Sequence, residues 1–71
     1  MLIFASLISP SPLPRWRYNR AIRALAAQGV YIHERDDALV VEMEDDSVLP
    51  LDVIDHVERE LGVKLELNFT S

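Results

Sequence analysis

Four carboxylates lie within five residues of this chain, at Glu42, Glu44, Asp45 and Asp46. Carboxylate oxygens gathered in this way are the ligands that Ca²⁺ prefers. An EF-hand calcium loop also needs an Asp-x-Asp-x-Asp-Gly spacing and a terminal Glu, and this stretch has neither. We therefore predict a solvated acidic edge that holds no metal.

The other side chains that could do chemistry are sparse. His33 and His56 are far apart in the sequence, and neither has a second His at a metal-binding spacing. An enzyme would need a nucleophile beside a base, a metal, or a glycine loop for phosphate. The only glycines are Gly29 and Gly62, and both are placed to end helices. We expect no catalytic residues, no cofactor and no enzymatic activity.

Trp16, Arg20 and Arg23 form the most informative set of side chains for binding. At about 100° per residue they lie on one side of a predicted helix. Trp and Arg are enriched in binding hot spots, and Arg can stack on Trp. This pattern indicates a partner-binding patch. The alternative is that Trp16 packs under the preceding proline-rich loop as additional core.

Length and composition limit the classes of protein that fit. Seventy-one residues make one domain, residues 1–71. The absence of Cys excludes disulfides and thiolate metal sites. The apolar residues 1–8 are too few to span a bilayer, and they lack the basic start of a signal peptide. We expect a soluble, cytoplasmic protein.

The net charge of −5 is unevenly distributed along the chain. Residues 1–35 contain five Arg and one Glu, whereas residues 36–71 contain eleven acidic residues against one Arg and one Lys. Such asymmetry bears on the choice of partner rather than on the fold.

Residues 30–43 predict a β-hairpin that turns at residues 36–37. In each arm apolar side chains alternate with largely polar ones, as is typical of an antiparallel sheet packed on one face only. The residues expected to point inward are Val30, Ile32, Leu39, Val41 and Met43.

The remaining elements follow from periodicity and from Pro and Gly. Residues 2–8 predict a strand that is apolar on both faces and belongs in the middle of the sheet. Residues 9–14 are a proline-rich connector. Helices are expected at residues 15–28 and from residue 47 or 50 to residue 61, each ended by Gly. Residues 63–69 predict a strand with Val63, Leu65, Leu67 and Phe69 facing inward.

The resulting order is β-α-β-β-α-β, which is the ferredoxin-like α+β pattern. Right-handed crossovers would place both helices on one face of a four-stranded antiparallel sheet. Many unrelated functions share this topology, so the fold by itself does not select among them.

The charge and the surface side chains favour a small acidic regulator or inhibitor. We expect it to dock on a basic surface of a larger nucleic-acid-handling machine, such as the transcription or replication apparatus. A short chain that starts at Met1 suits a free-standing regulator of the type that phages and plasmids carry. The expected partner-binding residues are Trp16, Arg20, Arg23, Glu42, Glu44, Asp45 and Asp46.

Two alternatives rank below this interpretation. The first is a ligand-sensing homodimeric regulatory domain. The second is an RNA-binding module, which would need aromatic residues on its two central strands for base stacking. The third strand instead offers Val40, Glu42 and Glu44 on its open side, and carboxylates there would repel phosphate. Direct nucleic-acid binding and membrane association are therefore not expected.

Overall fold

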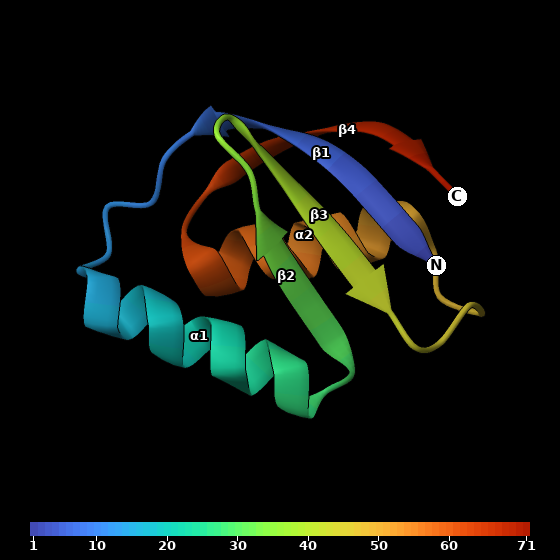
Figure 1. Cartoon of the computed structure of the whole chain (residues 1–71), viewed down its shortest axis with the longest axis horizontal. Coiled ribbons are helices and arrows are strands. Elements are labelled where there is room, and N and C mark those ends of the chain that lie inside the picture. Colours follow the sequence, from blue (N-terminus) through green and yellow to red (C-terminus); the bar gives the residue numbers. More distant parts are fainter.

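The chain folds into a four-stranded antiparallel sheet and two helices, and a computed structural model describes all residues from 1 to 71 (Figure 1). The elements in chain order are β1 (Leu2–Ser9), α1 (Arg15–Ala27), β2 (Val30–Glu34), β3 (Ala38–Met43), α2 (Pro50–Leu61) and β4 (Lys64–Thr70). The predicted β-α-β-β-α-β order is confirmed, and the fold is ferredoxin-like.

The strand order in the sheet is β2-β3-β1-β4, with every neighbouring pair antiparallel. The apolar strand β1 lies in the interior of the sheet, between β3 and β4, as its sequence predicts. Strands β2 and β4 form the two edges. In Figure 1 the helix α2 lies behind the strands, so one face of the sheet is covered and the other is open.

Proline and glycine set the ends of the helices. The carbonyl of Pro14 accepts the first hydrogen bonds of α1, and Pro50 occupies the first position of α2, where its missing N–H costs nothing. Gly62 adopts a left-handed conformation with φ of 69° just after α2. A side chain there would be strained.

A single cluster of 14 buried residues fills the space between the helices and the covered face of the sheet. The inward positions predicted for the hairpin are confirmed, with Ile32 only partly buried. The cluster consists of Ile3, Ala5, Tyr18, Leu25, Val30, Leu39, Val41, Met43, Val53, Ile54, Val57, Leu61, Val63 and Leu65.

The predicted inward orientation of Phe69 is wrong. The pairing of β1 with β4 runs Phe4 to Phe69 but Ala5 to Leu67, so Asn68 is an extra residue that forms a bulge. An inserted residue reverses the alternation of side chains beyond it. Leu67 therefore still packs against the core, whereas Phe69 turns to the open face and is 57% exposed.

Candidate protein-binding surface

The open face of the sheet is the side of the strands that no helix covers. Strand register places four side chains in one row across this face: His33 on β2, Val40 on β3, Phe4 on β1 and Phe69 on β4. Leu2, two residues before Phe4, lies beside this row. We call Leu2, Phe4, Val40 and Phe69 the apolar cluster.

Phe4 and Phe69 stack on each other at the centre of the apolar cluster. Their ring centroids are 4.3 Å apart and their planes differ by 16°. The contact depends on the bulge at Asn68, because without it the two rings would lie on opposite faces. The Asn68 amide also donates a 2.8 Å hydrogen bond to the Ser6 hydroxyl, which ties the bulge to β1.

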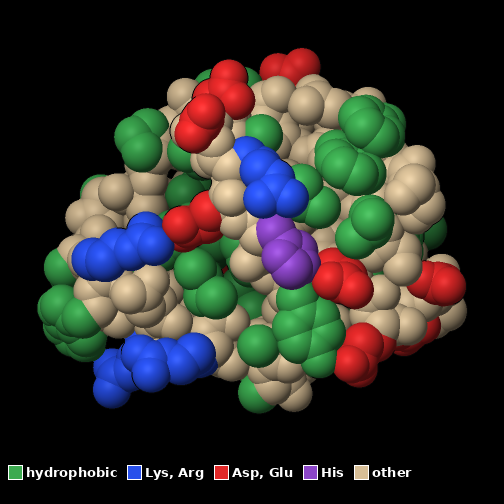
Figure 2. All heavy atoms as spheres, in the orientation of Figure 1, with side chains coloured by type: hydrophobic (Ala, Val, Ile, Leu, Met, Phe, Trp, Pro, Cys, Tyr) green, Lys and Arg blue, Asp and Glu red, His purple; other side chains and the backbone are tan.

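The apolar cluster lines a shallow hollow of about 500 Å³ on the open face. Figure 2 views the molecule from this side, and hydrophobic side chains gather at its upper right, over β1 and β4. A His, a basic side chain and several acidic side chains lie next to them, and Arg35 is among the residues that line the hollow. A contiguous exposed apolar patch with a polar rim is typical of an interaction site.

Over β2 and β3 the open face is largely polar, and two pairs of its side chains are hydrogen-bonded to each other. His33 Nε2 lies 3.0 Å from Glu42 Oε1, and the Tyr31 hydroxyl donates a 2.8 Å hydrogen bond to Glu44. That hydrogen bond, and then the charge of Glu44, raise the pKa of Tyr31 above its ordinary value. These pairs place the two carboxylates beside the apolar cluster.

The acidic residues extend from the open face into the loop after β3. Asp45 accepts hydrogen bonds from the Ser47 hydroxyl and from the Ser47 backbone N–H, at 2.7 and 2.8 Å, and these lower the pKa of Asp45. The Met1 amino group donates to Asp46 Oδ1 at 2.8 Å. We call Glu42, Glu44, Asp45 and Asp46 the acidic border.

Trp16 is 62% exposed, so the prediction that it lies at the surface is confirmed. The Arg20 guanidinium lies 5.6 Å from the centre of the Trp16 ring, within cation–π range. Arg23 is also exposed on α1. Binding by these three side chains remains a prediction.

The predicted partner-binding residues fall on two separate surfaces. The acidic border is contiguous with the open face, and Glu44 N–H bonds the carbonyl of Gly29 at the end of α1. Trp16 lies near the opposite end of that helix, about 18 Å away at 1.5 Å per residue. A partner centred on the acidic border would have to extend along α1 to reach Trp16.

The apolar cluster was not predicted from the sequence. The alternation in β1 puts Leu2 and Phe4 on the side opposite Ile3 and Ala5, and that signal could have been found. No sequence signal marks the bulge that brings Phe69 to the same side.

Two further observations concern metals and membranes. No three His, Asp or Glu side chains lie close enough together to hold a metal ion. Neither helix is long and apolar enough to cross a bilayer.

Comparisons with family models, curated proteins and solved structures yield no match to this chain. Its function must therefore be inferred from the residues of its own surface.

Proposed function

We propose that this chain is a protein-binding module, a small acidic regulator or inhibitor that docks through its open face. The observation that carries the proposal is the stacked Phe4–Phe69 pair, in which Phe69 is 57% exposed and Phe4 is partly exposed, beside the carboxylates of Glu42 and Glu44. Protein interfaces combine an aromatic, water-excluding centre with a polar rim, and this surface has both parts.

Charge suggests the kind of partner. The acidic border presents four carboxylates, and the chain carries a net charge of −5. A negative field of this kind attracts a basic partner and speeds its association. Basic surfaces commonly bind nucleic acid, so a component of the transcription or replication apparatus is the partner class that fits.

Three observations favour protein over RNA as the ligand of this face. Phe4 is the aromatic side chain on the central strands' open face, while β3 contributes Val40 and Glu42. Each Phe ring already covers one face of the other, which reduces the surface available for a base. The nearby carboxylates would repel a phosphate backbone.

A homodimeric ligand sensor is the second candidate. The same exposed apolar cluster could be covered by a second copy in a two-fold symmetric dimer. Sedimentation velocity across a hundredfold range of concentration separates the two candidates. A concentration-dependent dimer that Phe69→Ser abolishes would favour the sensor, and a monomer at all concentrations would favour the regulator.

The proposal is tested by affinity capture of the partner with the wild-type chain and two matched variants. Phe69→Ser removes one ring of the apolar cluster. Leu51→Ser removes an equally exposed apolar side chain from α2, where it is 68% exposed. We expect Phe69→Ser to lose the captured partner and Leu51→Ser to retain it. Equal capture by both variants would show that the open face is not the binding surface.

A further inference from the structure

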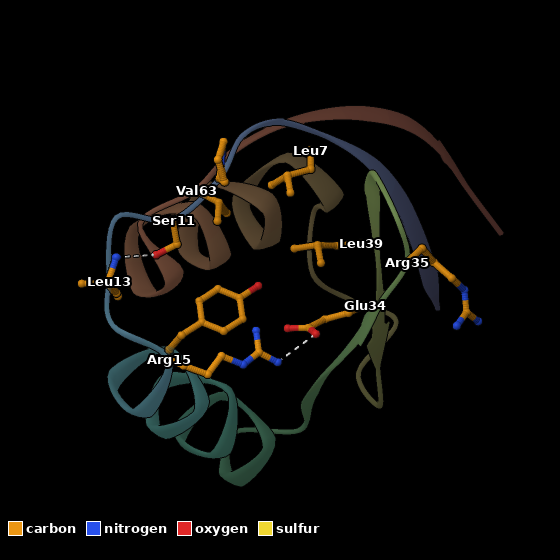
Figure 3. A pocket seen from close by; sticks show the side chains of 10 residues that line it. Leu7, Ser11, Leu13, Arg15, Glu34, Arg35, Leu39 and Val63 are labelled. Atoms are coloured by element: carbon orange, nitrogen blue, oxygen red, sulfur yellow. Dashed lines mark hydrogen bonds and ion pairs between the residues drawn. The ribbon is translucent and has the colours of Figure 1, made fainter.

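A second hollow lies away from the acidic border, at the end of the sheet next to the start of α1. Its volume is about 320 Å³, near the lower limit of small-molecule sites, which span about 300–1,000 Å³. Its inner wall is aliphatic (Figure 3). The aliphatic side chains come from the proline-rich connector, from β1 and β3, and from the residue before β4, and they are Leu13, Leu7, Leu39 and Val63.

An ion pair stands at the mouth of this hollow. Arg15 Nη2 donates to Glu34 Oε2 at 3.0 Å, and both side chains are at least partly exposed. The guanidinium also lies 5.1 Å from the centre of the Tyr18 ring. Arg35 lines the hollow but points away from it in Figure 3. The charge at the mouth is therefore one positive group balanced by one negative group.

Both members of the ion pair keep hydrogen-bonding capacity for a ligand. Glu34 Oε2 accepts from Arg15, and the Tyr18 hydroxyl also interacts with the Glu34 carboxylate. An ionised carboxylate has about four acceptor sites, so Glu34 can accept a further hydrogen bond. Arg15 uses only one of its five N–H donors. Burial, and then the charge of Glu34, raise the pKa of Tyr18 above its ordinary value. The Tyr18 side chain lines the hollow beside Glu34.

We infer that this hollow binds a free α-amino acid with an aliphatic side chain. The ligand carboxylate bonds the free N–H groups of Arg15, its ammonium group bonds the Glu34 carboxylate, and its side chain enters the aliphatic hollow. A zwitterion matches the mouth because each of its charges meets the opposite charge. A simple anion or cation satisfies one partner and repels the other. This inference does not depend on the proposed docking of the open face.

The first test is a ligand series on the full wild-type chain labelled with ¹⁵N. L-leucine is titrated to about 20 mM at pH 6.5, because a ligand this small binds an open site in the millimolar range. N-acetyl-L-leucine lacks the ammonium charge, L-leucinamide lacks the carboxylate, and glycine lacks the side chain. We expect saturable shifts of the Glu34, Leu39 and Val63 amide signals with leucine. Each of the other three compounds should bind about tenfold more weakly or not at all.

Variants of the ion pair provide the second test. Glu34→Gln and Arg15→Gln should each weaken leucine binding about tenfold while leaving the spectrum folded. The matched control is the Arg59–Asp55 pair on α2, which is also exposed and has a 3.3 Å separation. Arg59→Gln and Asp55→Asn should leave leucine binding unchanged.

Three results would overturn the inference. One is the absence of any saturable shift with leucine. Another is equal binding of leucine, its acetyl derivative and its amide, which would show an apolar hollow without recognition of charge. The third is an equal loss of binding in the Arg15–Glu34 and Arg59–Asp55 variants.

Discussion

The covered and open faces of the sheet differ less in sequence than in environment. In β1 the covered face carries Ile3 and Ala5, and the open face carries Leu2 and Phe4. Ile3 is completely buried because both helices pack on its side, whereas Leu2 and Phe4 are covered only in part. Apolar character thus does not decide burial here. Two helices can cover only one face, and the apolar side chains on the other face remain available to a partner.

A second contrast lies within the open face itself. Over β2 and β3 two polar pairs, His33 with Glu42 and Tyr31 with Glu44, form hydrogen bonds with each other. Over β1 and β4 the pair is aromatic and remains in contact with water. A solubility surface would be polar on both halves. The mixture of an apolar cluster with an acidic border is the arrangement expected of a docking surface.

The largest expected effect is a difference in stability between the same substitution at two neighbouring valines. Val41 is 0% exposed on the covered face, and Val40 faces outward. Val41→Asp buries an unpaired charge and should cost more than about 4 kcal/mol, enough to prevent folding. Val40→Asp should cost about 1 kcal/mol, through lower strand propensity. Thermal melts followed by circular dichroism would compare the stability of the two variants. A reversed order would mean that the two faces are interchanged.

The next effect concerns the rate at which a captured partner associates. Glu44→Lys with Asp45→Lys reverses two charges of the acidic border and leaves Asp46 bonded to Met1. We expect association about tenfold slower at low salt, and a smaller difference at high salt, because screening shortens the range of the field to roughly 10 Å at 0.1 M. Stopped-flow or biosensor kinetics from about 50 to 500 mM salt give the rates.

The control for charge reversal lies at the other end of the sheet. Asp36→Lys with Asp37→Lys makes the same change of charge in the β2–β3 turn, where both residues are exposed. Association should respond much less to this change. If the two double variants behave alike, net charge and not the acidic border governs association. If neither changes the rate, Trp16, Arg20 and Arg23 become the surface to test.

Most of the fold could be predicted from sequence, because several local signals agreed. Periodicity gave the inward residues of the hairpin, and Pro14, Pro50 and Gly62 marked helix ends where the structure has them. The position of Phe69 could not be predicted in this way. The bulge places Asn68 as an extra residue opposite β1, and neither a Gly nor a Pro marks it. Its cause is the pairing of two strands that are distant in the chain.

The candidate surface could be predicted only in part. The acidic border and the exposure of Trp16 follow from composition and helical spacing. The pairs His33–Glu42 and Tyr31–Glu44 depend on cross-strand register, and the Phe4–Phe69 stack depends on the bulge as well. Features that join separate strands need the three-dimensional structure, whereas features within one element do not.

The aromatic stack should make a smaller contribution to stability, which a double-mutant cycle can measure. The coupling between Phe4→Ala and Phe69→Ala should be about 0.5–1.5 kcal/mol in the free energy of unfolding. Phe69→Ala alone should cost about 1 kcal/mol, well below the 3–5 kcal/mol or so of a core Phe. Denaturant unfolding gives these values. Phe4→Ala combined with Leu51→Ala is the control cycle and should show no coupling. If Phe69→Ala cost as much as the truncation of a core Phe, Phe69 would be buried, and this would contradict the bulge.

The smallest expected effect is a change in the pKa of Asp45, which tests whether hydrogen bonds from Ser47 orient this carboxylate of the acidic border. Asp45 has a lowered pKa because the Ser47 hydroxyl, and then the Ser47 N–H, bond its carboxylate. A folded pKa below the unfolded one means that the folded state favours the carboxylate. Its stabilisation is therefore complete above the unfolded pKa and disappears as the pH falls through the folded pKa.

Ser47→Ala removes the hydroxyl and leaves the backbone donor in place. The pKa of Asp45 should therefore rise part of the way towards its ordinary value of 3.8, as measured by carboxyl ¹³C NMR titration. The small difference in melting temperature between wild type and Ser47→Ala should be present at pH 7 and vanish near about pH 2. Ser9→Ala, at an exposed position on β1, should leave Asp45 unchanged. An unaltered pKa of Asp45 in Ser47→Ala would show that Ser47 does not fix the carboxylate. The acidic border would then be mobile, and its charge would attract a basic partner without orienting it.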